Sequence, residues 1–146
     1  MLLLLAACAN LSKAPDSGLD TGLPLDGDWS GTVQGLVAFS EGQPGAYCSG
    51  EVEGRVFSTG LLRAVGTCEI AWGPFEGLTS EVFIEGTTEP VALGVRVPFE
   101  GGLRSFEVDV LSGQALGDEL TATGDGRYVT GDGNPYPARV ELSLVR

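Results

Sequence analysis

Apolar and polar residues alternate with a period of two along most of the chain after residue 27, and this alternation limits the folds open to it. No run of apolar residues at spacings of three and four is long enough to predict a helix. Gly, Pro, Asp and Asn interrupt the alternation at short intervals, as turns between strands require. We therefore predict an all-β domain over residues 27–146, built as a single antiparallel meander of about eight strands.

The expected strands lie at about 28–39, 47–57, 61–72, 80–86, 91–99, 103–111, 119–124 and 137–145. In the sixth strand, Phe106, Val108 and Val110 are expected to face the core. An even number of antiparallel strands lets the first pair with the last, so a closed up-and-down barrel would leave no exposed edge. A two-sheet sandwich can use the same strands and is the alternative.

The first eight residues are apolar and end in Leu5-Ala6-Ala7-Cys8. An apolar run followed by small residues is typical of an export signal. These last four residues resemble the lipobox of bacterial lipoproteins, in which the cysteine is lipidated and signal peptidase II cleaves before it. The resemblance implies a signal-peptide remnant over residues 1–7 and acyl chains on Cys8. Since no Lys or Arg precedes the leucines, we expect the true start to lie upstream of Met1.

Residues 8–26 then provide the lipidated cysteine and a flexible acidic tether, because Ser, Pro, Gly and Asp dominate without periodicity. Asp-Ser-Gly at Asp16 and Asp-Thr-Gly at Asp20 match the triplet of aspartic proteases, but two adjacent copies in a linker indicate solvated chain. Ala9 follows Cys8. In lipoproteins that are sorted, a residue other than Asp there favours the outer membrane, so the resemblance implies an envelope protein facing the periplasm or the cell surface.

Three cysteines are present, and with Cys8 lipidated an even pair remains. Cys48 and Cys68 are centred on residue 58, within a predicted turn, so a hairpin would place them opposite each other on one face. Export places the chain in an oxidising compartment, which favours a disulfide between these two cysteines. Two buried free thiols are the alternative.

Gly27-Asp28-Trp29 at the start of the first strand resembles the Gly-x-Trp signature of lipocalins and related calycins. In that family, a basic residue near the end of the last barrel strand packs across the tryptophan. Arg146 has the matching parity in the last strand, whereas Arg139 does not. The resemblance therefore implies a barrel closed by a cation–π pair between Trp29 and Arg146.

The composition of the chain limits its possible functions. The net charge is −12, so the chain repels phosphate and nucleic-acid binding is excluded. The sequence contains no histidine, so the commonest general base is missing. We expect no catalytic residues, no cofactor and no metal. Residues 123–136 are expected to form a polar hairpin loop, although Asp125, Asp132 and Asn134 there carry oxygens that calcium can use.

The remaining expectation is a non-catalytic, lipid-anchored module of the cell envelope with a structural or protein-interaction role, and with a basic partner. The alternative is a carrier of a small apolar ligand inside the barrel, since the inward glycines would either thin the wall or mark strong strand coiling. Thr123–Tyr128 also loosely resembles the inhibitory loop of small lipoproteins that block lysozyme. A filled interior with exposed aromatic residues at one rim would favour a partner surface, the candidates being Trp72, Phe75, Tyr128 and Tyr136.

Overall fold

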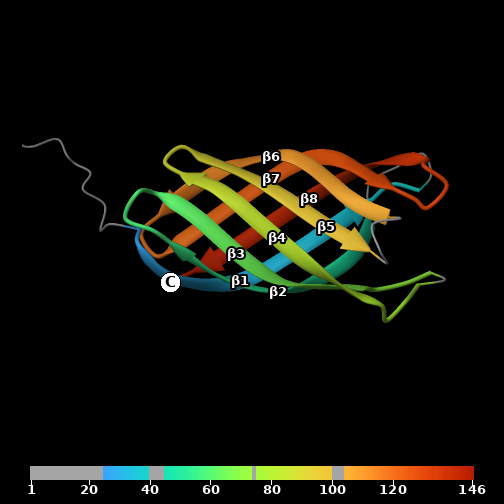
Figure 1. Cartoon of the computed structure of the whole chain (residues 1–146), viewed down its shortest axis with the longest axis horizontal. Coiled ribbons are helices and arrows are strands. Elements are labelled where there is room, and N and C mark those ends of the chain that lie inside the picture. The colour runs from blue at the N-terminus through green and yellow to red at the C-terminus, as the bar shows by residue number, and fades with distance from the viewer. Residues whose placement is uncertain (1–24, 40–44, 74, 100–103) are drawn as a thin grey trace, which may run out of the picture.

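The computed structural model describes residues 25–39, 45–73, 75–99 and 104–146, which form antiparallel strands (Figure 1). The strands are β1 (Gly27–Val37), β2 (Gly45–Val56), β3 (Leu61–Ile70), β4 (Thr79–Thr88), β5 (Val91–Phe99), β6 (Arg104–Leu116), β7 (Glu119–Val129) and β8 (Pro135–Val145). Each strand pairs with the next along the chain, and β1 also pairs with β8, so the sheet closes into a barrel. The prediction of an all-β meander closed into a barrel is confirmed, and the sandwich alternative is wrong.

The barrel has two distinct ends. β1 begins and β8 ends at one of them, where the blue start of β1 lies beside the C-terminus (Figure 1). We call this the Trp29 end, and Leu25 precedes β1 there. The strands β2, β4, β6 and β8 begin at the opposite end, which we call the aromatic end for the side chains described below.

Apolar side chains fill the barrel interior. At the level of Gly35, the ring of Phe106 reaches from β6 to β1, two strands that are not neighbours in the sheet. A Cβ atom added at Gly35 would lie only 2.7 Å from Cζ of Phe106. The barrel is therefore packed across its width at this level. The largest fully buried side chains are those of Trp29, Tyr128, Phe106, Leu62, Ile70 and Ile84.

Inward glycines mark close approach between neighbouring strands. A Cβ atom at Gly31, Gly50 or Gly66 would overlap a backbone carbonyl oxygen of the adjacent strand. The overlapping oxygens belong to Ser143, Thr67 and Glu51, respectively. Of the two interpretations left by the sequence, strong strand coiling accounts for these glycines, because the space that a side chain would need is already taken by backbone.

Two β-bulges shift the alternation of inward and outward residues. In β2, Gly35 of β1 pairs with Cys48 and Leu36 pairs with Ala46, so Tyr47 is an extra residue. Both Tyr47 and Cys48 are consequently buried. The second bulge lies in β6, where the pairing with β5 and β7 shifts after Val108. The expectation that Val110 faces the core is therefore wrong: Val110 is 55 % exposed, and Leu111 is buried in its place.

The chain between Thr123 and Tyr136 contains more strand than expected. β7 continues to Val129 and β8 begins at Pro135, so the predicted loop is reduced to a short turn. In that turn the amide of Thr130 donates to the carbonyl of Asn134 over 3.1 Å. The Thr123–Tyr128 stretch, whose sequence resembles an inhibitory loop, is thus part of the barrel wall.

Candidate functional site

The Trp29 end is closed by a compact set of contacts. The indole Nε1 of Trp29 donates to the carbonyl oxygen of Leu25 over 2.8 Å, and the ring is buried. The guanidinium carbon of Arg146 lies 5.6 Å from the Trp29 ring centroid, in the position that the sequence resemblance implied. Asp118 accepts hydrogen bonds from Nε and Nη2 of Arg146, at 2.9 and 2.6 Å. Arg139, by contrast, pairs with Asp125 on the outer wall.

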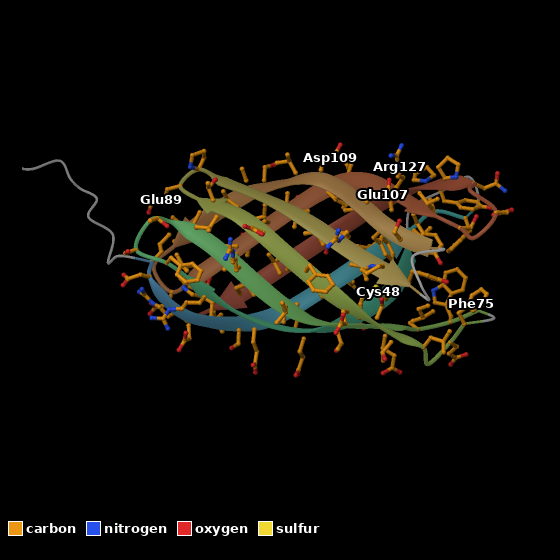
Figure 2. The ribbon with its side chains drawn as sticks, viewed as in Figure 1. Cys48, Phe75, Glu89, Glu107, Asp109 and Arg127 are labelled. Atoms are coloured by element: carbon orange, nitrogen blue, oxygen red, sulfur yellow. A yellow bond between two sulfur atoms is a disulfide. The ribbon has the colours of Figure 1, made fainter. Side chains whose placement is uncertain are left out.

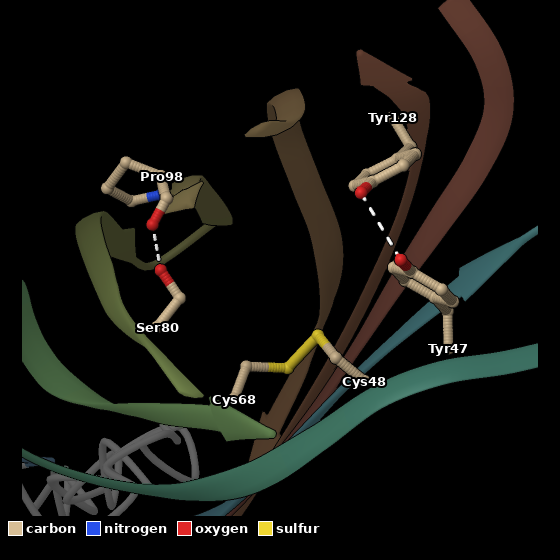
Figure 3. The surroundings of a disulfide bond; sticks show 6 residues. All are labelled: Tyr47, Cys48, Cys68, Ser80, Pro98 and Tyr128. Carbon is tan, nitrogen blue, oxygen red and sulfur yellow. Dashed lines mark hydrogen bonds between the residues drawn. A yellow bond between two sulfur atoms is a disulfide. The ribbon is translucent and has the colours of Figure 1, made fainter. Parts of the chain in front are cut away.

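A disulfide joins β2 to β3. Cys48 and Cys68 are bonded, with their Cα atoms 5.4 Å apart (Figure 3). The expected register was wrong, because the Cα partner of Cys48 is Ile70. Val56 pairs with Leu62, so the hairpin is centred on residue 59 rather than 58. The bridge therefore runs diagonally between the strands, and it fixes β2 next to the bulge that contains Tyr47.

Ring contacts join at least six of the described aromatic side chains into one connected cluster at the aromatic end. Phe39 contacts four of the others, with ring centroids separated by 5.0 to 5.8 Å. All four contacts are edge-on or tilted, as the quadrupoles of aromatic rings favour. The members of this aromatic cluster are Phe39, Tyr47, Trp72, Phe106, Tyr128 and Tyr136.

The aromatic cluster extends from the core to the surface. Phe106, Tyr128 and Tyr47 are buried, and the hydroxyls of the two tyrosines lie 3.3 Å apart in hydrogen-bond contact (Figure 3). Phe39 and Trp72 form the outer layer, 37 % and 44 % exposed. The indole Nε1 of Trp72 donates to the carbonyl of Ala46 over 2.6 Å, which orients its ring. The structure thus presents two fixed, exposed rings on a packed base.

The sequence anticipated only part of this surface. Trp72 is exposed and Phe75 lies at the far tip of the barrel, half-buried (Figure 2). Tyr136 is half-buried, whereas Tyr128 is buried, so its expected place at the rim is wrong. Tyr47 was missed because the bulge moves it out of the strand alternation.

The turn between β7 and β8 adds fixed polar groups at the aromatic end. Asp132 accepts hydrogen bonds from the hydroxyl of Thr130 and from the amide of Asn134, the latter over 2.6 Å. These hydrogen bonds hold the pKa of the Asp132 carboxyl below its ordinary value of 3.8, and the bond from Thr130 has the largest effect. Asp132 therefore keeps its negative charge near the exposed rings across the physiological range of pH.

Arginines on the neighbouring wall are neutralised by partners. Arg127 donates a hydrogen bond to Glu107 over 2.7 Å (Figure 2). Arg139 donates one to Asp125 over 2.8 Å. The same pairing lowers the pKa of the Asp125 carboxyl, mainly through the hydrogen bond from Arg139.

Cys8, the expected lipidation site, lies outside the described residues. Within the described ranges, no three or more His, Cys, Asp or Glu side chains gather closely enough to hold a metal ion. In the same part of the chain, no helix has the length and apolar character needed to cross a bilayer. Comparison of the chain with family models, with curated proteins and with solved structures gives no match.

Proposed function

We propose that the chain is an exported, non-catalytic lipoprotein of the cell envelope, held at a membrane by acyl chains on Cys8. In this proposal it binds another protein through the aromatic end of its barrel. The observation that carries the proposal is the pair of exposed rings, Phe39 and Trp72, packed 5.3 Å apart at the end opposite Leu25. Rigid aromatic rings of this kind are enriched at the centres of protein interfaces.

The position of the aromatic cluster suits an anchored protein. Leu25, the first described residue on the C-terminal side of Cys8, lies at the Trp29 end. Acyl chains on Cys8 would thus be joined to the barrel through the Trp29 end, and the aromatic end would stay free for a partner. Several acyl chains, at about 0.8 kcal/mol per buried methylene, would hold the protein firmly.

Charge supports a basic partner and a non-catalytic role. The chain carries 20 acidic and 8 basic residues, and Asp132 and Glu76 lie exposed in turns at the aromatic end. Acidic groups at the end that carries the exposed rings favour a partner with a basic surface. The absence of histidine from the sequence removes the usual activator of serine or threonine nucleophiles.

The alternative role, as a carrier of a small apolar ligand, has less support. A carrier needs an open interior, but the ring of Phe106 fills the barrel across to Gly35. An inhibitor of lysozyme has less support still, because the Thr123–Tyr128 stretch lies within β7 and does not protrude as a loop.

The anchor is tested by mass spectrometry of the protein isolated from the envelope of its own cells. We expect Cys8 to be the first residue and to carry the mass of acyl chains. The variant Cys8→Ser should appear in the soluble envelope fraction without that mass. Recovery of an unmodified Cys8 in the cytosol would contradict the anchor.

The partner surface is tested by photo-crosslinking in the same cells. A photoreactive amino acid is placed at position 72, and as a matched control at exposed position 121 on the wall of β7. We expect a crosslinked protein, identified by mass spectrometry, from position 72 only. Replacing Phe39 by Ala should reduce that yield severalfold. Equal yields at both positions, or crosslinks to this chain alone, would argue against the proposal.

A further inference from the structure

The outer wall formed by β3 to β6 carries a hollow of about 560 Å³. Gly94 lies in this hollow, and its role differs from that of the inward glycines. A Cβ atom at Gly94 would meet nothing closer than two backbone oxygens, at 3.7 and 3.8 Å. Packing within the barrel therefore does not require glycine at this position, and the missing side chain leaves an opening on the outer surface.

One arginine in the hollow lacks a carboxylate partner. Arg96 lies opposite Glu107 on the neighbouring strand, but Glu107 accepts hydrogen bonds from Arg127 and Ser105 instead. The guanidinium of Arg96 lies over the ring of Phe83, 5.6 Å from the ring centroid. No ion pair of Arg96 occurs among the described residues, so it presents an uncompensated positive charge beside Gly94.

An acidic residue in the same hollow is likewise unpaired. Asp109 is exposed at the β6 bulge and forms no ion pair within the described part of the chain (Figure 2). The other two charged lining residues, Arg63 and Glu85, neutralise each other over 3.1 Å. The hollow thus contains one unpaired charge of each sign: Arg96, which follows Gly94 by two residues on β5, and Asp109 on the neighbouring β6.

Apolar side chains adjoin these charges. Val65 and Phe83 are cross-strand partners, and they are 59 % and 37 % exposed. A second hollow shares Arg63 and Val65 with the first and extends the groove across β2 and β1 to Val145. The charged residues that line the two hollows are four arginines and four acids: Arg55, Arg63, Arg96, Arg146, Asp28, Glu53, Glu85 and Asp109.

The lining of these two hollows is electrically balanced in a chain whose net charge is −12. Two copies of such a chain repel each other in most orientations, but contact centred on the balanced lining of these hollows reduces that repulsion. In a two-fold interface, every contact between a residue of one copy and a residue of the other occurs a second time with the copies exchanged. One unpaired positive and one unpaired negative charge on each copy can therefore form two ion pairs. A single hollow with Arg96 and Asp109 is therefore complementary to itself.

We propose that a second copy of this chain docks on the β3–β6 wall as a two-fold dimer. Arg96 of each copy pairs with Asp109 of the other, Val65 and Phe83 become buried, and Gly94 lets the two walls approach. The aromatic end stays free in this dimer, so the proposal does not depend on the proposed function.

The test is sedimentation velocity of the full chain carrying Cys8→Ser, at low salt, from about 1 µM to 1 mM. We expect a concentration-dependent shift from monomer to dimer. Arg96→Asp or Asp109→Arg alone places like charges opposite each other twice, and should raise the dissociation constant at least tenfold. The double variant restores opposite charges and the wild-type net charge, and should return the constant to within about threefold of the wild type.

Three further variants distinguish contact through this wall from general effects of volume and charge. Gly94→Gln fills the hollow without crowding the barrel and should weaken the dimer, whereas Thr123→Gln on the wall of β7 should not. Glu51→Arg changes the net charge as Asp109→Arg does but lies outside both hollows, so it should not weaken the dimer. A chain that stays monomeric throughout, or a dimer indifferent to the single charge reversals, would overturn the proposal.

Discussion

The ring of Phe106, on β6, crosses the barrel and occupies the space that a side chain at Gly35, on β1, would need. Cζ of Phe106 would lie 2.7 Å from an added Cβ atom, and Sγ of Cys48 would lie 3.2 Å from it. Phe106 is also in contact with Tyr47 and Tyr128 of the aromatic cluster. The packing of the interior and the position of the exposed rings are thus linked through one buried side chain.

Gly35→Ala is expected to lower the free energy of unfolding by about 1–3 kcal/mol, since the added methyl group overpacks a filled interior. Urea denaturation measures the change. Gly94→Ala is the control and should stay within about 0.5 kcal/mol, because that Cβ meets no close atom. Combining Gly35→Ala with Phe106→Leu should recover part of the loss. An unchanged stability for Gly35→Ala would mean that the ring of Phe106 does not fill this space.

The alternation of residues predicted the closed meander but not its irregular positions. Alternation is a property of regular pairing, so it correctly placed Phe106 and Val108 in the core. A bulge adds one residue to one strand and leaves no mark in the composition. The predictions failed at these places: Val110 lies outside, and Tyr47 lies inside next to Cys48.

The candidate site was predicted less completely than the fold for the same reason. Trp72 could be placed at the rim because it ends a regular strand pattern. Tyr47 depends on the β2 bulge, and the burial of Tyr128 depends on the continuation of β7 to Val129. Arg96 contacts Phe83 rather than Glu107 because Arg127 pairs with Glu107. Predicting this choice requires the positions of the side chains, which the sequence pattern does not provide.

Loss of the disulfide should destabilise the barrel without changing its strand order. The bridge closes a chain segment with a sequence separation of 20, for which restriction of the unfolded chain contributes roughly 3 kcal/mol. We expect the double variant Cys48→Ala with Cys68→Ala to unfold at lower urea concentration by about that free energy. Circular dichroism should still report β-structure in water. Equal stability of the wild type with and without reductant would contradict a bridge between these residues.

Arg146→Met should weaken the Trp29 end. The substitution removes the guanidinium over the indole and the hydrogen bonds to Asp118, with an expected loss of about 0.5–2 kcal/mol. Thermal unfolding and the fluorescence of Trp29 in a Trp72→Phe background measure the two effects. Arg139→Met is the matched control, because Arg139 pairs on the exposed wall and should leave the Trp29 spectrum unchanged. Identical spectra for Arg146→Met and the parent would show that Arg146 does not contact the ring.

The carboxyl of Asp125 should titrate below its ordinary pKa of 3.8, because Arg139 donates a hydrogen bond to the ionised form and attracts it. A pKa lowered by folding means that the contribution of this group to stability is present above pH 3.8 and is lost as the pH falls through the folded value. Carbon-detected NMR titration measures it, and Arg139→Gln should move the midpoint up toward 3.8. Asp132 is the internal control: its pKa is lowered by Thr130 and Asn134, so Arg139→Gln should leave it in place. A midpoint for Asp125 that does not respond to Arg139→Gln would show that the ion pair does not persist in solution.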